Sequence, residues 1–141
     1  MVIHLPHIVV KLKIMIWTII YILFGHWVAD FVMQTHEMGI NKSTSTKWLT
    51  KHIVAYGNTL LALSLPLAIM YTILGKGQYV ILIILYILFN MAMHWITDYI
   101  TSKITKKYWE AQKVHEFFVV IGLDQFIHAT TLILSYYWIL N

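Results

Sequence analysis

The chain contains three aspartates, and each of them lies four residues from a histidine. The pairs are His26 with Asp30, His94 with Asp98, and Asp124 with His128. Residues four apart share one face of a helix, so each pair can present an imidazole and a carboxylate side by side. Imidazole nitrogens and carboxylate oxygens are ligands for Zn, Mn and Fe. The spacing therefore predicts a site for one or two divalent metal ions.

The three pairs lie in apolar stretches that are long enough to cross a membrane. There are four such stretches, at residues 14–33, 53–74, 79–99 and 117–140. Each has about 20 residues, which is what a helix needs to cross a hydrocarbon core of ~30 Å. The chain of 141 residues is 60% hydrophobic and 11% charged, against about 25% charged in soluble domains. We expect an all-α polytopic membrane protein, an antiparallel four-transmembrane-helix bundle, with residues 1–141 as a single domain.

Lysine placement predicts the orientation of these spans. Seven lysines lie in the expected loops 34–52 and 101–116, and three lie on the other side. Basic loops stay in the cytoplasm, so we expect both long loops there and both termini outside a bacterial inner membrane. The lysines should meet anionic headgroups of the bilayer rather than nucleic acid. The small size is compatible with a homo-oligomer or a membrane partner.

The orientation brings the ionisable residues of all four spans to one end of the bundle. Such residues cost ~2.5–3.5 kcal/mol in lipid, so they should face the interior and mark a functional site. The expected metal ligands are His26, His94 and His128, with Asp30, Asp98 and Asp124 completing the shell or acting as a general base. The expected neighbours are Gln34, His52 and Gln125, with His52 at the mouth of the site.

The same cluster has more than one chemical interpretation. A metal with an open position activates water, and two metals can clamp a phosphoryl group, so a hydrolase of a lipid-linked or phosphorylated substrate at the cytoplasmic leaflet is our leading hypothesis. A small channel, a transporter subunit or a proton path is the alternative, because histidine titrates near neutral pH. A third interpretation is a non-catalytic phage or host accessory protein, in which buried His–Asp pairs only fix the packing of the helices.

Several strings of the chain resemble a known family. They are GHWVADFVMQT at residues 25–35, Asn41-Lys42, MHWITDYI at 93–100 and LDQFIHA at 123–129. In this order they resemble the small membrane proteins of bacteria and phages catalogued as domain of unknown function 3307. That resemblance implies a membrane fold and leaves the activity open. A looser likeness to inner-membrane metal-dependent hydrolases implies that the HxxxD and DQxxH residues form the site. The chain has no arginine, so an anionic substrate would have to be met by lysine or metal.

Overall fold

The computed structural model describes residues 5–140, which are helical except for short connections. The elements are α1 (Leu5–Trp27), the π-helical turn η1 (Val28–Val32), α2 (His36–Asn41), α3 (Thr46–Ile73), α4 (Gln78–Glu110), α5 (Val114–Ser135) and the π-helical turn η2 (Tyr136–Leu140). Within the described residues, four helical segments are long and apolar enough to cross a membrane. The expected all-α membrane fold is therefore confirmed.

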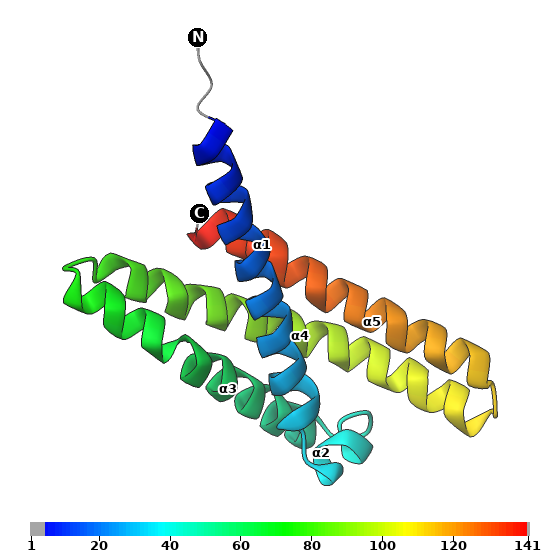
Figure 1. Cartoon of the computed structure of the whole chain (residues 1–141). Helices are drawn as coiled ribbons and strands as arrows, with labels where there is room; N and C mark the ends of the chain where they lie inside the picture. The colour runs from blue at the N-terminus through cyan, green and yellow to red at the C-terminus, as the bar shows by residue number, and fades with distance from the viewer. Residues whose placement is uncertain (1–4, 141) are drawn as a thin grey trace.

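Helix α4 is the centre of the molecule. It packs against α3 on one side and α5 on the other, and the three helices run antiparallel to their neighbours (Figure 1). Helix α1 crosses this layer obliquely and packs on α3 and α5, while η1 lies against α3 (Figure 1). The crossing brings the end of α1 to the point where α3 begins, and this is where the ionisable residues meet.

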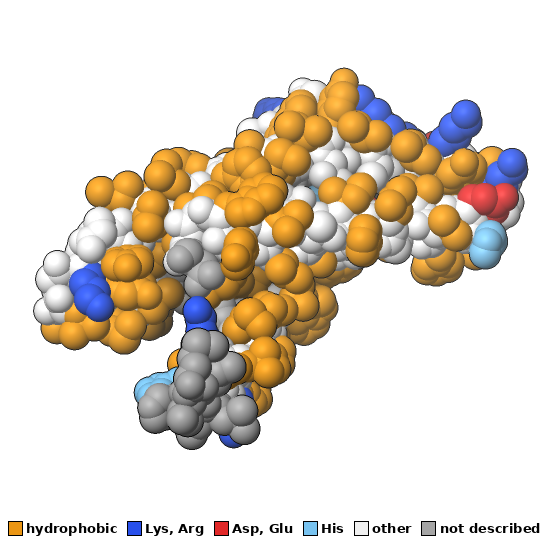
Figure 2. All heavy atoms as spheres, turned by 90° about the horizontal axis from the view of Figure 1, so that it is seen from above, with side chains coloured by type: hydrophobic (Ala, Val, Ile, Leu, Met, Phe, Trp, Pro, Cys, Tyr) orange, Lys and Arg blue, Asp and Glu red, His pale blue; other side chains and the backbone are white. Residues whose placement is uncertain are grey.

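The apolar core is small, and most of the apolar surface faces outward. Four buried residues form the core cluster: Ile83, Tyr86, Ile87 and Leu132. Figure 2 shows a largely hydrophobic face, with charged side chains gathered at the end of the molecule that holds the α4–α5 turn. Exposed apolar patches of this extent are not stable in water, so the bilayer must be the solvent of this surface.

The helices extend beyond the apolar stretches. The prediction of two long loops between them is therefore wrong. Helix α4 continues to Glu110, and the turn to α5 spans only residues 111–113, with Gln112 in the left-handed region at φ 55°. The stretch 34–52 contains α2 and the first residues of α3. Hydropathy indicates where contact with lipid ends, and this need not be where the helix ends. Helix α4 continues because its backbone hydrogen bonds persist and because ion pairs such as Lys106–Glu110, at 3.6 Å, stabilise its last turns.

Candidate metal centre

Asp30 owes its position to the π-helical turn at the end of α1. Turns of this kind are rare and occur frequently at functional sites, because they displace a side chain from the face it would otherwise occupy. Asp30 is buried in η1, and its carboxylate lies 3.8 Å from His26 Nε2 on the preceding turn. It lies nearer to other helices, at 3.0 Å from His52 Nε2 and 3.3 Å from His94 Nε2.

The first group of possible metal ligands joins three transmembrane segments. It consists of Asp30, His52, His94 and Asp98, all buried, with one ligand atom from each lying within 4.8 Å of the others. His52 Nε2 and His94 Nε2 are 3.2 Å apart, and Asp98 Oδ2 is 3.3 Å and 3.6 Å from them. Ligand atoms at ~2.0–2.2 Å from one ion are at most ~4.4 Å apart, so a small inward movement would complete the site.

The second group shares Asp98 with the first. It consists of Asp98, Asp124 and His128. His128 Nε2 lies 3.3 Å from Asp98 Oδ1 and 3.5 Å from Asp124 Oδ2, while Thr101 donates a hydrogen bond to Asp124. The two oxygens of Asp98 thus face different groups, so this carboxylate could contribute a ligand atom to each of them.

The three pairs at spacing four are all in contact, at 3.8, 3.6 and 3.5 Å, but Asp30 and Asp98 have shorter contacts to other helices. Asp30 is closer to His52 and His94 than to His26, and Asp98 is closer to His52 and His128 than to His94. The shorter contacts therefore run between helices. Pairs within single helices do not account for this cluster.

Two histidines have places that differ from those expected. His52 is completely buried at the centre of the first group, so its placement at the mouth is wrong. His26 belongs to neither ligand group, and its Nε2 lies 3.3 Å from the side-chain oxygen of Gln125. Gln125 also donates to Asp30 and Asp124, at 3.2 Å and 3.0 Å, and so connects α5 to η1. Gln125 is thus a neighbour of the cluster, as expected, through hydrogen bonds to two of its aspartates.

Lys42 is a member of the cluster that the sequence did not reveal. It follows α2, and its Nζ lies 2.8 Å from Asp98 Oδ2 with 18% of its side chain exposed. Burial lowers the pKa of Lys42, but Asp98 and Asp30 outweigh burial and raise that pKa above its ordinary value of 10.5. The ammonium therefore remains charged at neutral pH. The signal in the sequence is the Asn41-Lys42 string, which belongs to the family resemblance but gives no indication that Lys42 reaches Asp98.

The charges of the cluster suit a divalent ion. Three carboxylates and one ammonium leave two negative charges when the imidazoles are neutral. Uncompensated charge in a membrane interior is costly, and one divalent ion balances it. The Nε2 atoms of His52 and His94 are 3.2 Å apart, so only one of them can carry a proton that points at the other. A cation between them would bind the lone pairs of both atoms. The donor set therefore fits a metal.

The histidine rings are held by packing. His94 stacks on His128 with ring centroids 3.9 Å apart, and Tyr56 lies against His94 at 4.2 Å. Stacking fixes the ring planes, and neutral imidazole is the form that binds metals. The Nδ1 atoms of His26, His52 and His94 are buried without a hydrogen-bond partner among the described residues. These rings are oriented by stacking and by the carboxylates at Nε2.

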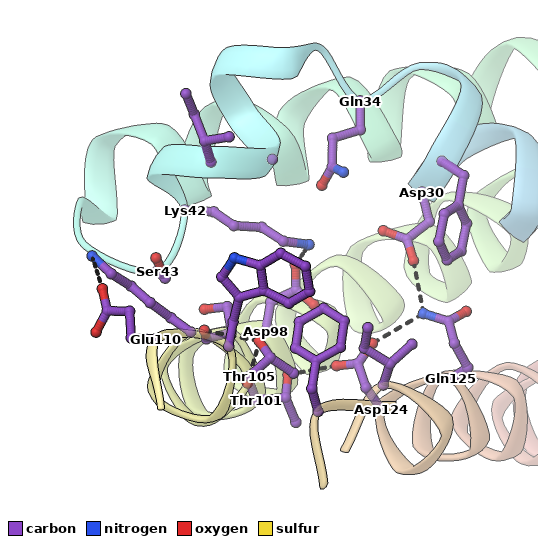
Figure 3. A pocket seen from close by; sticks show the side chains of 18 residues that line it. Asp30, Gln34, Lys42, Ser43, Asp98, Thr101, Thr105, Glu110, Asp124 and Gln125 are labelled. Carbon is purple, nitrogen blue, oxygen red and sulfur yellow. Dashed lines mark hydrogen bonds and ion pairs between the residues drawn. The ribbon is translucent and has the colours of Figure 1, made fainter. Parts of the chain in front are cut away.

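A cavity of about 550 Å³, lined by both polar and apolar side chains, opens onto the cluster from the side of α2. Figure 3 shows Lys42 reaching across it to Asp98, with Asp30 and Gln34 on one side and Asp124 and Gln125 from α5 on another. Gln34, expected as a neighbour, lines this cavity. The cluster is thus buried among the helices but has one face on a space that a small molecule can enter.

The chain matches one family model over residues 18–141, that of a protein of unknown function, DUF3307. The chain belongs to this family. The resemblance seen in the sequence is thereby confirmed, and the matched region of DUF3307 includes all residues of both ligand groups. No curated protein and no solved structure matches the chain. For this member of DUF3307 the function must therefore be argued from the site itself.

Proposed function

We propose that this protein is a membrane-embedded, metal-dependent hydrolase of a lipid-linked or phosphorylated substrate that enters from the cytoplasmic leaflet. The observation that carries the proposal is the sharing of Asp98 by two ligand groups beside a cavity. Divalent ions of Zn, Mn or Fe held by these groups would lower the pKa of a bound water and stabilise the charge of a phosphoryl group.

The residues of the chain would have distinct roles in this reaction. His52, His94 and Asp30 would hold the first ion, His128 and Asp124 would hold the second, and Asp98 would contribute to both. Asp124 is the most accessible of the three carboxylates, because 14% of its side chain is exposed, against 5% for Asp30 and 2% for Asp98. Thr101 and Gln125 orient its carboxylate by hydrogen bonds.

The walls of the cavity support a lipid-linked substrate. Phe31, Ile40 and Trp109 line it, and 48%, 59% and 57% of these residues are exposed. A cavity lined by both charged groups and exposed apolar side chains suits an amphiphile whose headgroup binds the polar groups and whose chain lies in the bilayer.

A conduction path is less well supported. Beyond the cluster, Ile83, Ile87 and Leu132 pack in the core, so a path through the described residues would have to cross an apolar layer. The nearest buried polar pair there, Asn90 and Ser135, is joined by a hydrogen bond of 2.9 Å. Dependence of ion flux in liposomes on Asp30 or Asp124 would favour the path, and tight liposomes would count against it.

The first test is elemental analysis of the protein purified in nanodiscs. We expect stoichiometric metal in the wild type and its loss in the His94→Ala, Asp98→Ala double variant. The matched control is His115→Ala, Glu116→Ala, which removes a histidine and a carboxylate outside both ligand groups. Phosphate release from phospholipid phosphomonoesters should follow metal content across the three proteins. Equal metal in all three, or none after refeeding Zn, Mn and Fe, would refute the proposal and leave packing as the role of the cluster.

A further inference from the structure

Ser102 differs from the other hydroxyl residues around it on α4. Thr101 donates to Asp124, while Thr97 and Thr105 each donate to the carbonyl four residues earlier, at 3.0 Å. The latter is the usual way in which a hydroxyl inside a helix is satisfied. The Oγ of Ser102 has no hydrogen-bond partner among the described residues, although the residue is only 8% exposed. A buried hydroxyl without a partner is costly, so this one calls for a ligand.

The position of Ser102 connects it to the candidate metal centre. It follows Asp98 by four residues, so it lies one helical turn, or ~6 Å, farther along the same face of α4. Both residues line the same cavity. Lys42 crosses this cavity to reach Asp98 (Figure 3). A group bound to an ion at Asp98 would therefore lie within reach of the Ser102 hydroxyl.

Charge indicates which kind of ligand fits. The cluster has two excess negative charges without metal, and two divalent ions would reverse this to two positive charges. An anion then balances the centre, and a phosphate group carries up to two negative charges near neutral pH. Lys106, which also lines the cavity, is already paired with Glu110 at 3.6 Å. The ions and Lys42 thus provide the positive field, and Ser102 provides a neutral donor.

A second unpartnered atom lies in the same cavity on another element. The side-chain oxygen of Gln34, after η1, is buried without a hydrogen-bond partner. An acceptor in that place suits a hydroxyl, which phosphorylated polyol headgroups carry next to the phosphate.

We propose that this cavity is a phosphate subsite for a phosphorylated amphiphile, in which Ser102 donates to a phosphate oxygen and Gln34 accepts from a headgroup hydroxyl. The proposal rests on the metal-dependent function above and names its substrate class. Metal binding and phosphate binding must then strengthen each other by the same factor.

The test measures binding of radiolabelled inorganic phosphate to Mn-loaded and metal-free protein in phosphatidylcholine nanodiscs. Ser102→Ala should weaken the phosphate affinity about tenfold, since it removes one hydrogen bond to a charged group, and should leave metal content unchanged. Thr105→Val is the matched control, because the Thr105 proton is already donated within α4 and its loss should not change the affinity. Gln34→Leu is a second variant on another element, and it should weaken glycerol 1-phosphate more than inorganic phosphate.

The outcomes separate this inference from the function on which it rests. Metal that is bound while phosphate affinity is the same in the wild type, Ser102→Ala and Gln34→Leu proteins would overturn the subsite and leave the metal centre standing. A protein without metal would refute both proposals. Phosphatidic acid in the nanodisc should displace the labelled phosphate, which identifies a lipid headgroup. Displacement by glycerol 1-phosphate alone would refute the lipid and assign the subsite to a soluble phosphoester.

Discussion

Loss of the Asp98 carboxylate should remove two bound metal ions from the protein, and loss of the Asp124 carboxylate only one. Asp98 belongs to both ligand groups, through Oδ2 toward His52 and through Oδ1 toward His128, whereas Asp124 belongs to the second group alone. We predict that Asp98→Asn lowers bound metal from two ions per chain to none, and that Asp124→Asn lowers it to one.

The size of the effect follows from electrostatics. Two unit charges ~4 Å apart at an effective dielectric of ~20 interact by ~4 kcal/mol. Because ~1.4 kcal/mol corresponds to a factor of ten, loss of the Asp98 charge should weaken each ion by at least about a thousandfold. An amide has nearly the shape of the carboxylate, so packing against Lys42 and the histidines should change little.

The assay is titration of metal-free protein in nanodiscs with Mn, followed by elemental analysis after desalting. Size-exclusion profiles of both variants should match the wild type, which shows that the fold survives. An equal loss in Asp98→Asn and Asp124→Asn would refute the sharing of Asp98 between two sites. Two ions retained in Asp98→Asn would refute its role as a ligand altogether.

Three further predictions follow from the geometry. His26→Ala should keep its metal by elemental analysis, because His26 lies in neither ligand group, and loss of an ion would restore it to the ligands expected from the sequence. Lys42→Gln should bind Mn at least about tenfold more tightly in competition titrations, because it removes a positive charge 2.8 Å from Asp98. Unchanged affinity would show that Lys42 moves away on metal binding. Gly57→Ala should lower the free energy of unfolding by about 1–3 kcal/mol, because a Cβ there would overlap the Met91 side chain. In thermal unfolding, Gly57→Ala and Met91→Ala together should be less destabilising than the sum of the two separate effects.

The proposals concern different observables. Metal content reports on Asp30, His52, His94 and Asp98, while phosphate affinity reports on Ser102. The phosphate subsite can therefore fail while the metal centre stands, whereas absence of metal refutes both.

The membrane fold could be predicted from the sequence because it depends on local properties. About 20 apolar residues in a row require a helix in lipid, and four such stretches leave little choice of fold class. The helix ends could not be predicted in this way. Helix α4 continues through lysines to Glu110, since hydrogen bonding along the backbone does not stop where the hydrocarbon ends.

The sequence by itself determined that the Asp and His residues four apart are largely buried between the helices, because such residues are costly in lipid and must face inward. Only the tertiary structure decided how they pair. The oblique crossing of α1 and the π-helical turn direct Asp30 toward His52 and His94, and away from the spacing-four contact with His26. The packing of the helices also places Lys42 and Ser102 in the cavity beside Asp98. Contacts between helices depend on crossing angle and helix rotation, which residue spacing within one helix does not contain.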